Sequence, residues 1–171
     1  MKEIEVKILE VDKKRVMDRL KELGARRVFN GVIESIYFDD AKGSLRKKGI
    51  VLRLRRKGKQ FELSLKKLLS QKQAKVMNEF EISLKDLKTM GQLLNQLGFR
   101  SIRYFRKHRM SFAFKENRVE IDSYSGIPPF LEIETRSLPK LKTLVERLGF
   151  LPRDAKPWST FELFKHYRGH R

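Results

Sequence analysis

The sequence predicts an α+β protein that combines short antiparallel β-strands with amphipathic helices. Charged side chains recur at positions i and i+2 in several segments rich in Val, Ile, Leu and Phe, which is the alternation of a strand with two different faces. A Glu-x-Glu strand, an amphipathic helix and a Leu-Gly ending also occur together three times, at residues 3–24, 79–98 and 132–149. The segments between these units differ in length and character, so we do not expect a solenoid.

The first segment places Glu3, Glu5 and Lys7 on one face and aliphatic residues on the other. Taken alone, this pattern favours a surface strand with its charged face in water. The rest of the chain changes that interpretation, because the same alternation returns with both signs of charge. The further pairs are Arg53/Arg55, Glu79/Glu81, Lys107/Arg109, Glu120/Asp122 and Glu132/Glu134, and Glu62, Ser64 and Lys66 share a face in the same way.

The remaining elements follow from periodicity and from capping residues. Helical spacing predicts a helix over about residues 12–23, with Asp12 as N-cap and Gly24 as its end. An extended stretch at 26–39 is followed by turns at Gly43 and Gly49 and by short strands at 50–55 and 61–66. We expect a polar loop at 67–75, a strand at 76–84, and two further strand-helix units that end at Gly98 and Gly149.

Two architectures are compatible with these charged faces. In the first, helices cover the apolar face of an open sheet and leave the charged face in water. In the second, a closed or nearly closed antiparallel barrel directs its charged faces into a polar lumen, and the helices pack outside. Opposed buried charges are costly unless a ligand or metal completes them, so the second architecture would itself indicate a function.

Composition limits the class of protein. The 171 residues fit one domain, residues 1–171, and contain no apolar run of membrane-spanning length. The chain opens directly into a strand without a signal-peptide pattern and has no cysteine, which favours a cytoplasmic protein and excludes thiolate chemistry. The net charge of +19 indicates a polyanionic partner, such as a nucleotide, polyphosphate, nucleic acid or an acidic membrane surface.

The mixture of charges suggests what a polar lumen would bind. Arginine and lysine recognise phosphate oxygens, whereas carboxylates repel them unless a divalent cation lies between. Mg²⁺ and Mn²⁺ prefer oxygen ligands, and a chain without cysteine and with three histidines offers mainly carboxylates. Opposed acidic and basic clusters therefore suit a metal-bound polyphosphate.

At this point the motifs resemble a known family. Residues 3–7, Glu-Ile-Glu-Val-Lys, match the ExExK signature of the CYTH family, the triphosphate tunnel metalloenzymes. That family includes class IV (CyaB-type) adenylyl cyclases, thiamine triphosphatases and inorganic triphosphatases. Its other motifs follow in order along nearly the whole chain, at residues 37–39, 45–50, 52–55, 65–66, 79–81, 107–109, 122, 130–134 and 159–163.

The resemblance implies an eight-stranded antiparallel tunnel that takes a triphosphate with Mg²⁺ or Mn²⁺. Carried over to matching positions, it implies that the cations that bind and act on the triphosphate are Lys7, Arg53, Arg55, Lys66, Lys107 and Arg109. It implies a metal held by Glu3, Glu5, Asp122, Glu132 and Glu134. Glu81, together with Glu79, would complete the acidic lining of the substrate site, and Lys156 would contribute from the C-terminal segment.

The chain departs from the family pattern at two positions. Ser35 stands where many relatives carry an acidic residue, and Trp158 replaces the commoner tyrosine. These changes concern contacts to a nucleoside more than the triphosphate site. We expect His108 to point outward, His166 and His170 to be tail residues, and Trp158 and Phe161 to pack the last helix.

The motifs do not separate the possible reactions. Chain length and the runs at 45–55 and 130–134 are most similar to the CyaB-type branch, which predicts conversion of ATP to cyclic AMP and pyrophosphate. The same residues would serve a triphosphatase acting on inorganic triphosphate, thiamine triphosphate or a nucleotide. A nonenzymatic binder of RNA or polyphosphate is the alternative of another class, although we favour a solubilising surface over a nucleic-acid site. The resemblance also suggests a homodimer.

Overall fold

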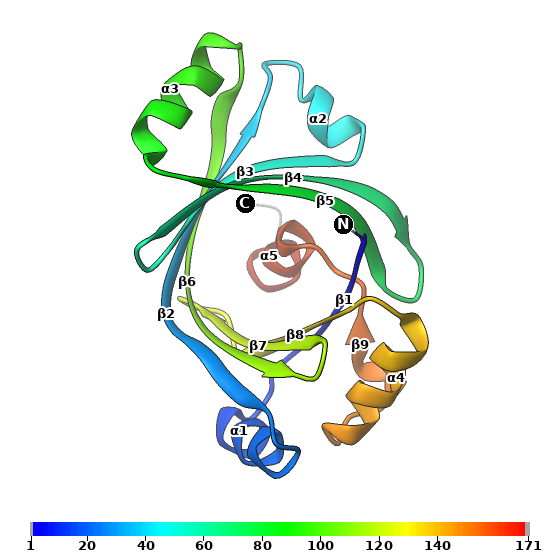
Figure 1. Ribbon diagram of the computed structural model, residues 1–171. Coiled ribbons are helices and arrows are strands. Elements are labelled where there is room, and N and C mark those ends of the chain that lie inside the picture. Colours follow the sequence, from blue (N-terminus) through cyan, green and yellow to red (C-terminus); the bar gives the residue numbers. More distant parts are fainter. Residues whose placement is uncertain (1, 170–171) are drawn as a thin grey trace.

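The computed structural model describes residues 2–169 and shows an antiparallel β-barrel with helices around it (Figure 1). The strands are β1 (Lys2–Ile8), β2 (Arg26–Asp39), β3 (Ile50–Lys57), β4 (Gln60–Gln71), β5 (Lys75–Leu84), β6 (Arg100–Phe114), β7 (Asn117–Tyr124), β8 (Phe130–Thr135) and β9 (Ala155–Lys156). The helices are α1 (Lys13–Glu22), α2 (Ser44–Lys47), α3 (Leu87–Gln96), α4 (Leu138–Arg147), the 3₁₀ helix η1 (Pro152–Asp154) and α5 (Thr160–Arg168).

The first eight strands close on themselves. Their order is β5-β4-β3-β2-β6-β7-β8-β1, and β1 pairs again with β5 through Lys2–Glu5 and Lys75–Asn78. The short strand β9 pairs with β1 at Lys7 and Ile8. The expected α+β barrel with helices packed outside is therefore confirmed, and the open sheet is excluded.

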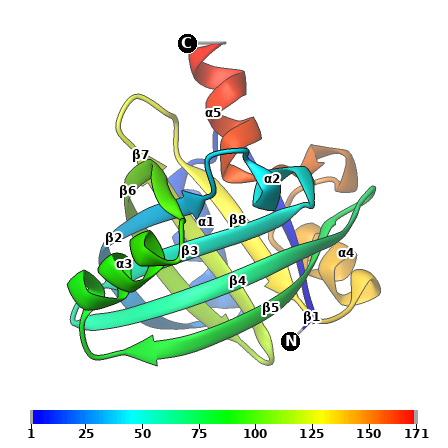
Figure 2. The same cartoon turned by 90° about the horizontal axis from the view of Figure 1, so that it is seen from above.

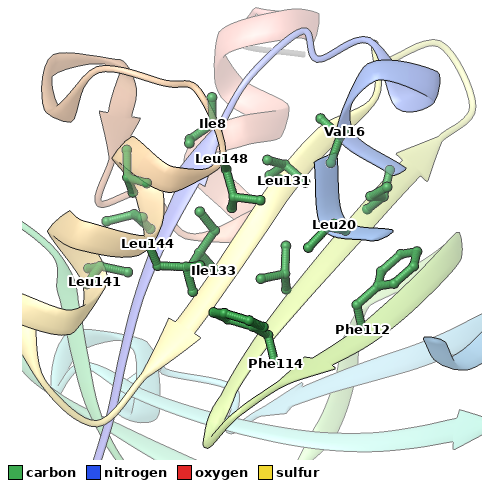
Figure 3. Packing of buried hydrophobic residues seen from close by; sticks show 14 of the residues in the cluster. Ile8, Val16, Leu20, Phe112, Phe114, Leu131, Ile133, Leu141, Leu144 and Leu148 are labelled. Carbon is green, nitrogen blue, oxygen red and sulfur yellow. The ribbon is translucent and has the colours of Figure 1, made fainter. Parts of the chain in front are cut away.

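The apolar faces of the strands point outward and are covered by helices. α1 and α4 pack on β1, β7 and β8 (Figure 3), where Leu20, Ile121 and Ile133 are fully buried. α3 covers a second cluster formed with β3 and β4, which includes Leu52 and Leu54. In the described part of the chain, no helix is long and apolar enough to span a membrane.

The repeated strand-helix unit is a real structural unit. Asp12 accepts hydrogen bonds from the backbone N–H groups of the first turn of α1, as its sequence position predicted. The glycine that follows each of α1, α3 and α4 has a positive φ, between +77° and +87°, which only glycine adopts without strain. The recurring Leu-Gly ending is therefore a left-handed helix stop that returns the chain to the barrel.

One sequence expectation was wrong. Residues 67–75 do not form a polar loop, because β4 continues to Gln71 and β5 starts at Lys75, so the turn is confined to residues 72–74. The pairing of β4 with β5 shifts register between Leu68 and Ser70. This irregularity breaks the period-2 alternation, and without alternation the segment looks like a loop in the sequence.

Helix α5 stands at one end of the barrel, with its axis roughly along the barrel axis (Figure 1 and Figure 2). Figure 1 looks along the barrel and shows α5 within its outline, and Figure 2 shows the helix rising from that end. Its Leu163 is fully buried, and the ring of Phe161 packs edge-on against Tyr37 and Phe105. The expectation that Phe161 packs the last helix is confirmed, and α5 closes this end with aromatic side chains.

Candidate active site: a charged tunnel inside the barrel

The inward faces of the strands enclose a cavity of about 710 Å³. Its size suits a small-molecule ligand, but its lining is unusually rich in charge. Most of the residues that the sequence predicted for the site line it together: Glu3, Glu5, Lys7, Arg53, Arg55, Lys66, Glu79, Glu81, Lys107, Arg109, Glu132 and Glu134. The convergence of both signs of charge on one lumen follows from barrel closure, as the second architecture expected.

Lys7 is fixed between two carboxylates on neighbouring positions of the wall. β1 and β8 place it directly opposite Glu132, whose carboxylate lies 2.8 Å from the Lys7 Nζ atom, and Glu5 lies 3.2 Å away. Burial would lower the pKa of Lys7, but Glu132 and Glu5 raise it well above its usual value. Burial likewise opposes ionisation of Glu5, yet Lys7 and Lys75 lower its pKa to about 2. These groups stay charged because they neutralise each other.

Asp122 organises two cations from beneath the cavity surface. It is fully buried, accepts two hydrogen bonds from Arg109 at 2.7 and 2.6 Å, and accepts one from Lys107 at 2.7 Å. Arg109 also reaches Glu132 at 2.8 Å and forms an ion pair with Glu120. The resemblance implied a metal ligand at Asp122; in the structure both of its oxygens hold Arg109 and Lys107, and it does not line the cavity.

The opposite wall, on β3 and β4, has donors without acceptors. Glu62 lies 2.8 Å from Arg55 and 3.8 Å from Arg53. Within residues 2–169, however, the buried Nε and Nη2 atoms of Arg53, Nε of Arg55 and Oγ of Ser64 have no hydrogen-bond partner. Burial raises the pKa of the neighbouring Tyr37, but Arg53 lowers it below its ordinary value. Unpaired buried guanidinium donors are costly, so they are available to bind an anion, although Oε1 of Glu62 on the same wall also has no hydrogen-bond partner among the described residues.

A group of carboxylates lies near the N-terminal end of β1. Glu3 accepts a hydrogen bond from Lys66 at 2.5 Å, and Lys66 also lies 3.2 Å from Glu79. Burial, together with the nearby carboxylates of Glu3 and Glu120, raises the pKa of Glu134 to about 8. Mutual repulsion between carboxylates is relieved by a divalent cation, and oxygen-only donors fit Mg²⁺ or Mn²⁺. Across the described residues no three acidic or histidine side chains are already arranged as metal ligands.

Sequence reasoning missed several residues of the cavity. Arg118 on β7 lines it, and Lys75 binds Glu5 at 2.6 Å; Glu120, which the sequence assigns to a charged strand face but to no site, lines it as well. Because the sequence predicts a loop at residues 67–75, it does not reveal that Lys75 shares a strand face with Met77 and Glu79. The aromatic rings of Tyr37, Tyr124 and Phe161 complete the lining at the end covered by α5. Tyr37 lies within the motif at residues 37–39, but that motif alone does not assign it a role.

Other predicted residues lie elsewhere. Lys156 does not line the cavity, and its Nζ atom lies 3.4 Å from the carbonyl oxygen of Arg153. His108 is exposed, as the alternation of β6 predicted. The ring of His166 packs against Trp158 and Tyr167, and His170 lies outside the described residues.

A second cavity of about 670 Å³ adjoins the first at the aromatic end. Tyr37, Val51 and Phe161 line both cavities, as do Lys75, Met77 and Ser159. Away from these shared residues the second cavity is lined by the β2–α2 loop, α2 and the start of β3, including Phe38, Ile50 and Leu52. A charged compartment therefore leads into a less polar one.

Comparison with known proteins identifies the relatives of this chain. It is 31% identical over 134 residues to a protein of Methanocaldococcus jannaschii named "Putative adenylate cyclase", which covers 78% of this chain and 77% of that protein. A solved structure from Vibrio parahaemolyticus, also named a "putative adenylate cyclase", shares the fold with a TM-score of 0.84 at 18% identity. The match covers 95% of this chain and 97% of that chain.

The name of another solved structure with this fold states an activity. The structure of a Hippeastrum protein, named for adenylyl cyclase and described as having a dominant triphosphatase activity, matches with a TM-score of 0.68 at 21% identity. The match covers 96% of this chain and 95% of that chain. The CYTH domain family model matches residues 1–147, so this chain belongs to the CYTH domain family.

Proposed function

We propose that this protein is a divalent-metal-dependent enzyme that binds an organic triphosphate in its tunnel, and that its reaction is the cyclisation of ATP. The observation that supports the proposal most directly is the set of unpaired donors on Arg53, Arg55 and Ser64. Although Glu62 lies 2.8 Å from Arg55, several buried guanidinium donors of Arg53 and Arg55 have no acceptor among the described residues, so they are free to bind phosphoryl oxygens.

The residues divide the work by chemistry. Arg53 and Arg55 would hold phosphoryl groups by their planar forks, and Lys66 would add a point charge between the two walls. Glu3 and Glu134, with Glu120, would hold the divalent cation, since these carboxylates otherwise repel each other. A cation bound there would neutralise phosphate charge and help to align the attacking oxygen with the phosphorus.

The neighbouring cavity supports an organic group on the triphosphate. A chain of phosphates held by Arg53 would extend past Tyr37 and Phe161 into the less polar compartment. Aromatic faces at this junction suit the stacking of a base. In cyclisation, the ribose 3′-hydroxyl gives up its proton and its oxygen attacks the α-phosphorus, the bond between the α-phosphorus and the oxygen that bridges to the β-phosphorus breaks, and pyrophosphate leaves with the proton.

Hydrolysis of a triphosphate is the second candidate. The same cations and carboxylates would serve it, with water as nucleophile at the terminal phosphorus, and the Hippeastrum neighbour is described as mainly a triphosphatase. The two reactions differ only in which oxygen is held in line with which phosphorus.

Product analysis separates these reactions. The purified protein is incubated with ATP, thiamine triphosphate or inorganic triphosphate, each with Mg²⁺ or Mn²⁺, and the products are resolved by chromatography. Cyclic AMP with pyrophosphate supports cyclisation, and release of inorganic phosphate supports hydrolysis. Absence of turnover with every triphosphate and both metals would overturn the enzymatic proposal.

A matched pair of variants separates an enzyme from a passive polyanion binder. Glu3→Gln keeps the size of the side chain but removes a carboxylate from the proposed metal site, and we expect it to abolish metal-dependent turnover. Glu146→Gln changes an exposed carboxylate on α4 and should leave turnover intact. A binder without activity would instead retain polyanion affinity in both variants and lose it steeply as salt is added.

A further inference from the structure

The surplus positive charge of this chain lies outside the tunnel. Within residues 2–169, eight lysines and arginines line the tunnel, together with seven glutamates. Asp122 and Glu62 form further ion pairs with the same cations. The tunnel therefore accounts for almost none of the net charge of +19, and a polyanion attracted by that charge would meet the outer surface first.

A groove of about 1100 Å³ lies between α5, β6 and α2, where α5 projects from the barrel (Figure 2). Four cations line it, namely Arg46 on α2, Arg103 on β6, and Lys165 and Arg168 on α5. All four side chains are exposed, so the groove opens to solvent. No described aspartate or glutamate lines it, so its charge has a single sign, unlike that of the tunnel.

Three of these cations are available to a ligand. Across the described residues, Arg46, Arg103 and Lys165 form neither an ion pair nor a side-chain hydrogen bond. Arg168 is held in place, because its Nη2 atom donates to the carbonyl oxygen of Ser125 at 2.7 Å and its guanidinium lies 4.7 Å from the centre of the Phe164 ring. Like charges without counter-charges attract anions, and arginine and lysine bind phosphate oxygens well.

Aromatic rings lie among these cations. Tyr104 lines the groove with 52% of its surface exposed, and its hydroxyl donates a hydrogen bond to Glu34 at 2.6 Å. Tyr167 also lines the groove, and its hydroxyl donates to Glu10 at 2.9 Å. These hydrogen bonds fix both rings before any ligand arrives. Fixed aromatic rings beside free cations are the two components of single-strand recognition, in which bases stack and phosphates are neutralised.

We propose that this groove binds single-stranded nucleic acid, with phosphates on Arg103 and Lys165 and bases stacked on Tyr104 and Tyr167. The groove is larger than the tunnel cavity of about 710 Å³, so it has room for more than one nucleotide. The bases of a duplex are already stacked on each other, and a flat anionic membrane would touch only the rims of a concave site. Among the described lining residues the groove and the tunnel share only Phe161, so the two sites can be tested separately.

A charge reversal tests the position of the phosphates. The probe is a fluorescent oligodeoxythymidine of about 12 nucleotides with a 5′-hydroxyl end, and its binding is measured by anisotropy in EDTA. Wild-type protein should bind it, with an affinity that falls as salt is added, and Lys165→Glu should weaken binding about 10-fold. Lys142→Glu, on the exposed side of α4, makes the same change in net charge and should weaken binding less than about twofold. No binding by the wild type, or equal losses in the two variants, overturns the proposal.

A second variant tests the stacking of bases. Tyr104→Leu keeps an apolar side chain but removes the ring, and it should weaken oligodeoxythymidine binding by about 5- to 150-fold. Its affinity for inorganic polyphosphate, which has no bases, should stay at the wild-type value. A circular dichroism spectrum like that of the wild type shows that the variant is folded. If Tyr104→Leu weakens both ligands equally, or neither, the groove does not read bases and the proposal is wrong.

Three further measurements separate the groove from other anionic partners and from the tunnel. Duplex DNA of the same length should bind at least about 10-fold more weakly than the single strand, and phosphatidylserine vesicles should not displace it. Arg53→Met changes the tunnel and should leave oligodeoxythymidine affinity unchanged. Tighter binding of the duplex, displacement by the vesicles, or loss of binding in Arg53→Met would each contradict a single-strand site in the groove.

Discussion

The two walls of the tunnel carry similar side chains but differ in how those side chains are satisfied. We call Lys7, Lys107, Arg109, Asp122 and Glu132, on β1, β6, β7 and β8, the paired wall. Every one of these groups lies within 3.2 Å of an opposite charge. We call Arg53, Arg55 and Ser64, on β3 and β4, the receptive wall, because buried donors there have no partner among the described residues.

This difference separates structural charge from functional charge. In the paired wall, each cation offsets a carboxylate whose burial would otherwise be very costly, so the wall can fold before any ligand arrives. In the receptive wall, a cost remains after folding and is recovered only when an anion binds. Residues of the same type therefore contribute to stability on one side and to binding on the other.

The largest effect should come from breaking the paired wall. Asp122→Asn leaves Lys107 and Arg109 buried without their shared carboxylate, and we expect the free energy of unfolding to fall by about 3–5 kcal/mol. Urea denaturation of the metal-free protein measures this change. The control is Glu116→Gln, which breaks an ion pair with Lys140 whose two side chains are about half exposed, and it should change the free energy of unfolding far less than Asp122→Asn does. If both variants lose a similar amount of unfolding free energy, the buried charges of the paired wall are no more important for stability than an exposed ion pair.

The receptive wall should respond in the opposite way. Arg53→Met removes unpaired donors, so stability should change little, while affinity for inorganic triphosphate in the presence of Mn²⁺ should fall by about 1.5–3 kcal/mol, roughly 10- to 150-fold. Titration calorimetry gives the affinity. Arg56→Met, one position along β3, is the control because Arg56 lies outside the lumen with 57% of its side chain exposed. An equal loss of affinity for Arg56→Met would contradict the assignment.

The cluster of carboxylates formed by Glu3, Glu120 and Glu134 should govern metal binding. In wild-type protein, Mn²⁺ at 100 times its dissociation constant should raise the free energy of unfolding by about 2.7 kcal/mol. Glu134→Gln removes one of the carboxylates that repel each other, and a tenfold weaker affinity would reduce that gain by about 1.4 kcal/mol. Thermal denaturation with and without EDTA measures it, with Glu146→Gln on α4 as control. A full metal response in Glu134→Gln would exclude Glu134 as a ligand.

The smallest effect should come from Lys156, which the sequence placed in the site. Because its ammonium group lies near the carbonyl of Arg153 and outside the cavity, Lys156→Met should alter triphosphate affinity by less than about twofold, roughly 0.4 kcal/mol. Lys66→Met is the comparison, since Lys66 lines the lumen. A loss for Lys156→Met that approaches the loss for Lys66→Met would return Lys156 to the substrate site.

Much of the barrel follows from alternation alone. The period-2 charges of residues 3–7, 53–55 and 107–109 predicted which side chains face inward, and the extended stretch at 26–39 coincides with β2. Closure of the barrel then brings those faces together without further information. Alternation fails at the irregularity between Leu68 and Ser70. There the sequence no longer predicts a strand, and it cannot predict that Lys75 faces the lumen.

The depth of each side chain could not be read from the sequence. Glu120 and Asp122 share one strand face, yet Glu120 lines the cavity and Asp122 lies beneath it. Asp122 lies beneath the cavity because Lys107 and Arg109, both on β6, donate hydrogen bonds to its carboxylate. Those contacts are set by packing between neighbouring strands. Sequence periodicity assigns a face to each residue but does not assign its partner.

The closing seam of the barrel has a consequence for folding during synthesis. β1 is the first strand to be made, but its partners are residues 75–78 of β5 and 131–135 of β8. Contacts between such distant parts of the chain form slowly, and they cannot form before the later strands have been synthesised. The strand that supplies Glu3, Glu5 and Lys7 therefore cannot pair with β5 before residues 75–78 have been made, and the barrel cannot close on β8 before residues 131–135 have been made.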